Sequence, residues 1–212
     1  SATEWTHRRL GKAPMTIRKT LAILAAIALS GAPTLAGATE YRADLNGVST
    51  VNRSGSAATA SALVSLDTAA QTVAVTIDVH GLTIDALWDV LVDRPAGPIH
   101  LHRYAGTDLS DPNSSSLAFP VPFDATYRAT ADGFSVSTGP RPYAEGAAIL
   151  GLQASFADLA AAMDAGSIVV NIHTDAFNGG EISGQLVPSA GPAVAPLASN
   201  PEPATPTDHS RH

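Results

Sequence analysis

Cysteine is absent from this chain of 212 residues, and its only two lysines are Lys12 and Lys19. Without cysteine the chain has no disulfide, no thiolate metal site and no cysteine nucleophile, so a bound metal must take nitrogen and oxygen ligands. Basic residues are also few: 12 Lys plus Arg stand against 19 Asp plus Glu, a formal net charge of -7 with His neutral. Non-specific nucleic-acid binding needs a basic surface that displaces phosphate counterions, so this charge argues against a nucleic-acid partner.

The N-terminal region has the order of segments of a secretory signal peptide. Arg18 and Lys19 precede the apolar run 21–29, and Ala36-Gly37-Ala38 gives an A-x-A cleavage pattern. We therefore predict that residues 1–38 are an N-terminal extension and signal peptide, with Met15 as the initiator. The apolar run is short for a membrane span, so we expect no membrane attachment after cleavage. The alternative is an uncleaved anchor. Export without cysteine is typical of a bacterial periplasmic or secreted protein.

The sequence predicts one folded domain, residues 39–187, followed by a disordered tail, residues 188–212. The tail is rich in Pro, Ala and Ser, a composition that buries too little apolar surface to fold. The part between the signal and the tail has about 150 residues, which is enough for one hydrophobic core.

Apolar residues in the domain recur mainly at every second position, which predicts strands. The clearest case is a hairpin of 60–66 and 73–79 around a polar turn at 67–71. Further strands are expected at 86–92, 99–103, 125–136, 168–173 and 181–187. Pro120 and Pro122 favour an edge strand or an extended loop at 118–123. One short helix should begin at Ser155 and end at Gly166. Many short strands with one helix predict an all-β antiparallel sandwich.

Three histidines are predicted to share one face of a sheet. Alternate side chains of a strand leave opposite faces, so if Ile99 and Leu101 face the core, His100 and His102 both point outward. The same phase in the strand at 168–173 points His173 outward. Neutral imidazole is a good ligand for copper and zinc, and three of them could hold one ion.

We therefore predict a metal site of His100, His102 and His173, with copper as the ion and zinc as the alternative. Bonds of about 2 Å to one ion require the three rings to lie within roughly 8 Å of one another. Asn171, Asp175 or Glu181 could accept the second ring N–H of a histidine and so orient it. The alternative is that these histidines are ordinary hydrogen-bonded or surface residues. His80, at the end of a strand, is left out of the set.

At these residues the sequence resembles the CHRD domain, a module named after chordin. The stretch 170–186 is similar to the closing motif of that family, with its Asn-x-His-Thr strand, Gly-Gly turn and Glu-Ile-x-Gly-Gln-Leu strand. The stretches 99–102, 79–82 and 41–47 resemble the His-x-His strand, the preceding Gly-Leu and the opening strand. The resemblance covers about 40–187. It implies a Greek-key-like β-sandwich, immunoglobulin-like or superoxide-dismutase-like, and little about activity.

A second similarity concerns mechanism. Gly-Leu followed by His-x-His also occurs in copper–zinc superoxide dismutases. Those enzymes need further histidine and aspartate ligands and normally a disulfide, whereas this domain has four histidines and no cysteine. No nucleophile elbow or phosphate loop is present. We expect an exported metal-binding module more than an enzyme. The alternatives are an adhesion or scaffold domain that binds an extracellular protein without metal, and a copper-dependent redox enzyme.

Overall fold

The structure, a computed structural model, describes residues 37–49 and 51–189. The predicted signal peptide and the predicted tail lie almost entirely outside these residues. No helix within the described ranges is long and apolar enough to cross a membrane.

Every strand pair in the described chain is antiparallel, and all the strands belong to one sheet. In chain order the strands are β1 (Thr39–Asn46), β2 (Thr59–Asp67), β3 (Thr72–His80), β4 (Ile99–Tyr104), β5 (Ser115–Val121), β6 (Tyr127–Ala129), β7 (Gly133–Ser137), β8 (Arg141–Pro142), β9 (Ile168–Ile172), β10 (Ile182–Gln185) and β11 (Val187–Pro188). The predicted all-β antiparallel class is confirmed.

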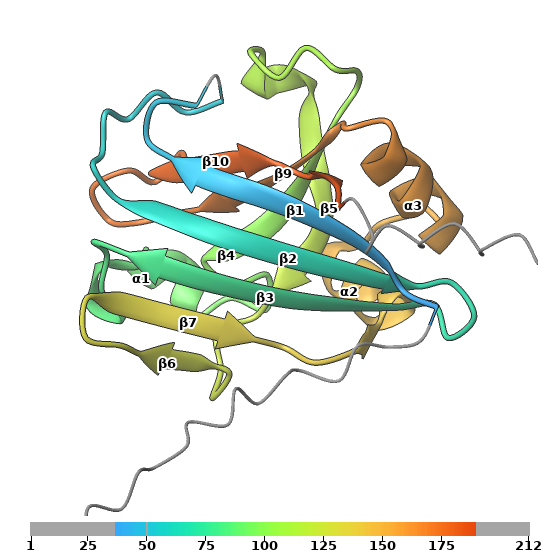
Figure 1. Cartoon of the computed structure of the whole chain (residues 1–212), viewed down its shortest axis with the longest axis horizontal. Helices are drawn as coiled ribbons and strands as arrows, with labels where there is room; N and C mark the ends of the chain where they lie inside the picture. The colour runs from blue at the N-terminus through green and yellow to red at the C-terminus, as the bar shows by residue number, and fades with distance from the viewer. Residues whose placement is uncertain (1–36, 50, 190–212) are drawn as a thin grey trace, which may run out of the picture. The chain divides into compact units, whose positions relative to one another are not determined.

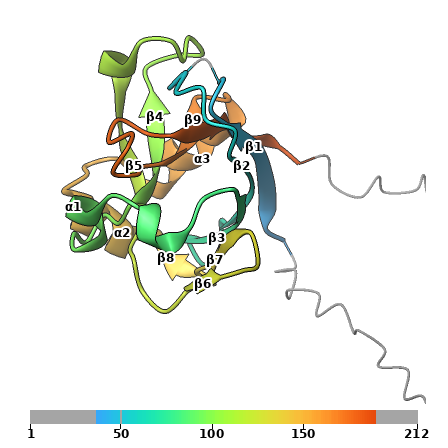
Figure 2. The ribbon, with the colours of Figure 1, turned by 90° about the vertical axis from the view of Figure 1, so that its left-hand side faces the viewer.

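The two layers predicted for a sandwich are two halves of this one curled sheet. The strand order is β5-β4-β9-β10-β1-β2-β3-β7-β6, with β11 paired to β1 and β8 to β3. The sheet bends so that β4 and β5 lie across the core from β1, β2 and β3 (Figure 1 and Figure 2). The main hydrophobic core lies between the two halves and includes Leu45, Ile77, Leu101, Phe134 and Ile172.

The predicted hairpin is confirmed as β2 and β3. The alternation of its sequence becomes an alternation of burial: every second residue of β2 and β3 is buried in the core, and the residues between them are exposed or half-buried. β5, which contains Pro120, lies at one end of the strand order, as the prolines predict for an edge strand.

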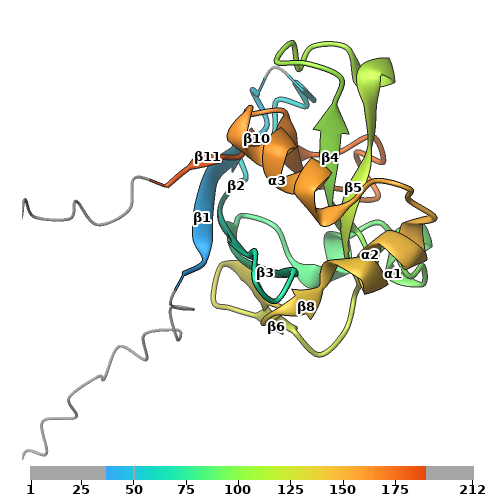
Figure 3. The same cartoon turned by 90° about the vertical axis from the view of Figure 1, so that its right-hand side faces the viewer.

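Helices cover one end of the curled sheet (Figure 3). The predicted helix is confirmed as α3 (Phe156–Asp164), whose capping box joins Ser155 and Asp158 reciprocally. A second helix, α2 (Tyr143–Leu150), was not predicted, although Pro142 before it and left-handed Gly151 after it are typical boundary signals. Both helices bury side chains in the main core.

The predicted strand at 86–92 is wrong. The segment forms a 3₁₀ turn, Ile84–Ala86, and a single helical turn, α1 (Asp89–Val92). Long-range backbone contacts decide this: the Trp88 N–H donates to the carbonyl of His173, and Leu87 makes an isolated bridge to Thr174. The segment is therefore fixed against the end of β9.

The predicted single strand at 125–136 is two strands, β6 and β7, joined by a tight turn. The Thr130 N–H donates to the carbonyl of Gly133 and closes that turn. Gly133 begins β7 against β3, where a Cβ would overlap the carbonyl group of Val79. A second 3₁₀ turn, Pro112–Ser114, precedes β5.

Candidate metal centre

Register brings the three histidines together. In the β4–β9 ladder Ile99 is opposite Ile172 and His100 is opposite Asn171. The ladder continues beyond β9, because the His173 N–H donates to the carbonyl of Pro98. His173 is therefore a diagonal neighbour of His100 on the same face of the sheet, within reach of a long side chain.

A bulge in the edge strand β5 lies opposite the step from Leu101 to His102 in β4. β5 pairs Phe119 with Leu101 and Leu117 with His102, so Ala118 is the extra residue. Such a bulge bends the local strand and re-aims the side chains beside it. His102 follows His100 at a spacing of two and stays on the same face.

The ring centroids lie 4.7 Å apart for His100 and His173, 5.4 Å for His100 and His102, and 5.9 Å for His102 and His173. One nitrogen from each ring lies within 4.8 Å of the other two. The separations are inside the limit of roughly 8 Å expected from metal–nitrogen bonds of about 2 Å.

The face that carries the histidines is buried beneath the connection between β1 and β2. His100 is 4% exposed and His173 6% exposed. In that connection, Asn52 donates from its amide to Asn171, and Val51 packs on a small cluster that contains Val169. The outer side of β9 is therefore part of a second, partly polar interior.

A second segment, 82–97, packs against His173. The Trp88 ring lies 6.3 Å from the His173 ring, centroid to centroid. Asp175 stabilises this segment from the turn after β9: its carboxylate accepts the N–H of Asp89 at the start of α1, and its own N–H donates to Ala86. The site thus has an aromatic side chain on one side and the sheet on the other.

Three buried ring nitrogens have no hydrogen-bond partner among the described residues: His100 Nδ1, His102 Nε2 and His173 Nε2. The tautomer of His173 follows from its other nitrogen. Nδ1 lies 2.8 Å from the carbonyl oxygen of Asn178, which only accepts, so Nδ1 carries the proton and Nε2 carries a lone pair. Nearly all buried polar atoms in proteins are paired, so three buried ring nitrogens without partners on neighbouring side chains require an explanation.

The surroundings keep these rings neutral. The pKa of His100 is lowered to about 2, mainly by burial and to a smaller extent by repulsion from the neighbouring His173 and His102. Burial, with a contribution from His173, lowers the pKa of His102 to about 4. Burial also lowers the pKa of His173, against the opposing effect of its bond to the Asn178 carbonyl. Neutral imidazole is the form that binds a metal ion.

The sequence model of the CHRD domain matches residues 41–186, which is more than half of the chain. The chain belongs to the CHRD family. No curated protein and no solved structure matches it.

In this CHRD domain the ring N–H of His173 is oriented by a backbone carbonyl. The three side chains predicted for that role, those of Asn171, Asp175 and Glu181, make other contacts. The Asn178 carbonyl reaches His173 because residues 174–180 turn back on the end of β9: the N–H groups of Phe177 and Gly180 donate to the carbonyls of Thr174 and Phe177. The Asn-Gly-Gly turn is visible in the sequence, but the direction of a carbonyl within it is not.

Asn171 and Glu181 connect the strands to the covering loop. Glu181 is 7% exposed, and its carboxylate accepts hydrogen bonds of 2.6 Å from the hydroxyls of Ser56 and Thr174. Asn171 accepts from Asn52 and donates to the carbonyl of Gly179. Gly180, at a φ of 115°, leaves room for both amides, because a Cβ there would overlap them.

His80 lies apart from the three histidines, at the end of β3. Its ring is exposed and lies 2.9 Å from the carboxylate of Asp132 in the turn between β6 and β7. Within the described residues, the only group of three potential ligands close enough for one ion is His100, His102 and His173.

Proposed function

We propose that this CHRD domain is a binding module that holds one copper ion through His100 Nδ1, His102 Nε2 and His173 Nε2. Two observations in the described part of the chain carry the proposal: one nitrogen of each ring lies within 4.8 Å of the other two, and each ring has a buried nitrogen without a hydrogen-bond partner. An unsatisfied buried polar group costs about 1–3 kcal/mol. Three of them in one place are stabilised together by a single ion that accepts their lone pairs.

The donor set fits copper and, as the alternative, zinc. Both ions take neutral imidazole, and copper(II) ranks above zinc in general affinity for nitrogen sites. With bonds of about 2.0–2.1 Å, ligand nitrogens around a tetrahedral ion are about 3.3 Å apart. Nitrogen–nitrogen separations of up to 4.8 Å would therefore have to shorten by up to about 1.5 Å. When bound, the ion supplies a redox-active or Lewis-acidic centre.

The residues of the chain prepare the site before any ion enters. Burial keeps the rings deprotonated, and the Asn178 carbonyl fixes the tautomer of His173. The side chain of Trp88 occupies the space beside His173. These contacts favour a defined mononuclear site over a loose surface association.

A redox enzyme of the superoxide dismutase type is the second candidate. It is less supported because the fourth histidine of the domain, His80, is paired with Asp132 away from the cluster. Turnover of superoxide or peroxide by the copper-loaded protein, well above that of free copper, would favour it. A scaffold or adhesion domain without metal remains the outcome if copper neither binds nor stabilises the fold.

We also propose that the protein is exported to the periplasm or secreted, on the strength of the signal pattern around Arg18 and Ala38. Mass analysis of the protein recovered from its own cells tests this. A mature chain that begins at residue 39 is expected, and a chain that retains residues 15–38 contradicts it.

The metal site is tested by removing ions with a chelator, reloading with copper or zinc, and measuring stoichiometry and unfolding. One copper per chain is expected, with a gain in unfolding free energy of about 2.7 kcal/mol when free copper is a hundred times its Kd. His100→Ala should weaken copper binding by at least the roughly 100-fold that loss of an outer hydrogen bond can cause.

The matched control is His80→Ala, which removes an exposed histidine from the same domain and should retain one copper per chain. Unaltered copper stoichiometry and affinity in His100→Ala contradict the site. Equal unfolding midpoints with and without copper support the scaffold interpretation.

A further inference from the structure

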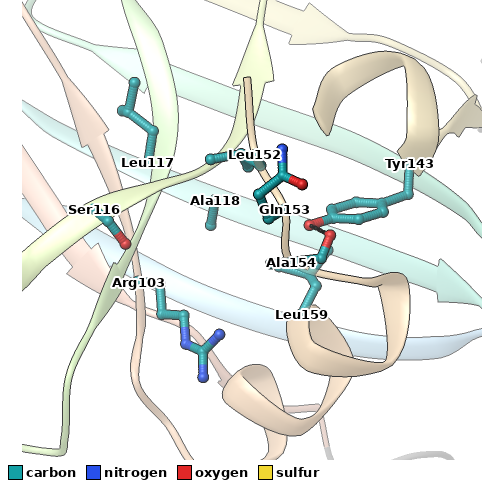
Figure 4. A pocket seen from close by; sticks show the side chains of 9 residues that line it. All are labelled: Arg103, Ser116, Leu117, Ala118, Tyr143, Leu152, Gln153, Ala154 and Leu159. Carbon is teal, nitrogen blue, oxygen red and sulfur yellow. Dashed lines mark hydrogen bonds between the residues drawn. The ribbon is translucent and has the colours of Figure 1, made fainter. Parts of the chain in front are cut away.

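A pocket lies on the opposite face of β4 from the histidines, where β4 and β5 meet the two helices (Figure 4). Arg103 follows Leu101 at a spacing of two, so it shares the inward face of β4 rather than the face of His100 and His102. The pocket has a volume of about 180 Å³. It is separate from the metal centre.

The walls of the pocket are mainly apolar. They are formed by Leu117, Ala118, Leu152 and Leu159 together with the ring of Tyr143. The Tyr143 hydroxyl donates to the carbonyl of Ala154, so its proton is already used in a hydrogen bond within the protein. An engineered apolar cavity of about 150 Å³ binds benzene, so this space suits an apolar group of that size.

Arg103 supplies the only cationic side chain of the lining. The ion pairs among the described residues are Arg42 with Glu40, Arg141 with Asp124 and His80 with Asp132, and Arg103 takes part in none of them. The side chain of Arg103 is exposed. Figure 4 shows it among the lining residues, next to Ser116, its partner in the β4–β5 ladder. An unpaired guanidinium at the edge of an apolar pocket is a recognition group for a carboxylate.

Arg103 has an electrostatic effect on one carboxylate, that of Asp158, and this carboxylate already accepts other hydrogen bonds. The Asp158 carboxylate accepts from the N–H and the hydroxyl of Ser155 in the cap of α3. These bonds lower the pKa of Asp158, and Arg103 lowers it by a smaller amount. Asp158 thus caps the helix, and the guanidinium of Arg103 has no ion-pair partner among residues 37–49 and 51–189.

We propose that this pocket binds a small monocarboxylate with an apolar body of about the size of a benzene ring. The carboxylate pairs with Arg103, and the apolar body lies against Leu152, Leu159 and the Tyr143 ring. The hydroxyl of Ser116 and the amide of Gln153, both in the lining, offer neutral hydrogen bonds at the polar rim. The charge of Arg103 makes the site select an acid over its uncharged amide.

The test uses the full chain, treated with a chelator so that no carboxylate binds through a metal, and titrates three probes by NMR. Benzoate supplies both the charge and the ring, benzamide only the ring, and acetate only the charge. Benzoate is expected to bind saturably and about tenfold more tightly than either of the others, because a charge-assisted hydrogen bond is roughly twice as strong as a neutral one. The amide signals that shift should include those of Ser116 and Gln153.

Two variants locate the binding. Arg103→Gln should remove the tenfold preference for benzoate over benzamide, and Ala154→Leu, which fills the pocket from a loop, should weaken both probes. Arg128→Gln, an exposed arginine on β6, is the matched control and should bind benzoate as the parent does. Circular dichroism checks that each variant is folded.

Saturable benzoate binding that Arg103→Gln leaves unchanged overturns the proposal. Equal affinity for benzoate and benzamide also overturns it, as does the absence of a saturable benzoate shift. None of these results affects the metal site, because the histidines lie on the other face of β4.

Discussion

The two halves of the curled sheet differ in what covers their outer faces. In β2 and β3 the outward residues are exposed or half-buried, and no polar side chain of β1, β2, β3 or β7 is fully buried. In β9 all five residues are buried, and Asn171 is among them. Both halves bury their inward apolar residues in one core.

The difference shows that the two-residue alternation of a strand determines the face on which each side chain lies. It does not determine whether another segment of the chain packs over that face. Outward residues of β2 meet solvent. Outward residues of β4 and β9 meet the connection between β1 and β2 and the segment 82–97. The histidine on the first half, His80 at the end of β3, is exposed, whereas His100 and His173 are held in a buried site.

The largest difference in stability between the two halves is expected when a charge is placed on the outer face of each. Val169→Asp puts a carboxylate on a fully buried outward position of β9, next to Tyr104 and Leu109. We expect a loss of about 4–5 kcal/mol in the free energy of unfolding, because a buried charge without a partner is among the costliest substitutions.

The matched change is Leu63→Asp, at a half-buried outward position of β2, where a loss of about 1 kcal/mol or less is expected. Urea unfolding of both variants measures the difference. Equal losses would mean that the loops do not bury the outer face of β9 in solution.

Acid should destabilise the metal-free protein because burial favours the neutral form of His100 and His102, which lie in the half of the sheet that contains β4 and β9. Because the pKa of His100 falls to about 2 and that of His102 to about 4, the unfolded chain binds more protons than the folded chain below the ordinary histidine pKa of 6.5. Stability is therefore full above pH 6.5 and declines as the pH falls towards those values. At pH 5 each of the two histidines contributes a loss of about 2 kcal/mol.

Urea unfolding of the chelator-treated protein at pH 7.5 and pH 5 tests this. His100→Leu, which keeps the volume of the side chain and removes its proton site, should reduce the acid loss by about 2 kcal/mol. An acid loss that is the same in His100→Leu and the parent contradicts burial of a neutral His100.

A smaller effect is expected at the contact that joins the covering loop to the sheet. Glu181→Ala removes the acceptor of the Ser56 and Thr174 hydroxyls and should cost about 1–3 kcal/mol. Asp44→Ala, at an exposed outward position of β1, should change stability by about 0.5 kcal/mol or less. Hydrogen exchange should also become faster at the β9 amides in Glu181→Ala only, and equal exchange in both variants contradicts the role of Glu181.

Sequence reasoning located the parts of the fold in which local pattern and tertiary packing agree. The strict alternation of β2 and β3 and the cap of α3 at Ser155 were predicted from nearby residues alone. It failed at 86–92, where the apolar content indicated a strand. In the structure a hydrogen bond from the Trp88 N–H to the His173 carbonyl holds this segment in a turn. Sequence reasoning also missed α2, whose boundary residues Pro142 and Gly151 were available as signals.

For the candidate site, sequence reasoning identified the three histidines and their common face, because strand phase is a local property. It did not identify their neighbours. The partner of the His173 ring is the Asn178 carbonyl, and the Glu181 carboxylate binds hydroxyls of Ser56 and Thr174. Such contacts depend on how turns far apart in the chain meet in space.

The sequence by itself determined the absence of thiol ligands, the all-β class and the phase that sends His100, His102 and His173 to one side of their strands. Only the tertiary structure decided that this side is an interior and that three ring nitrogens there lack partners within the described chain. The physical reason is that side-chain direction repeats every two residues along a strand, whereas burial is set by whichever segments pack over it.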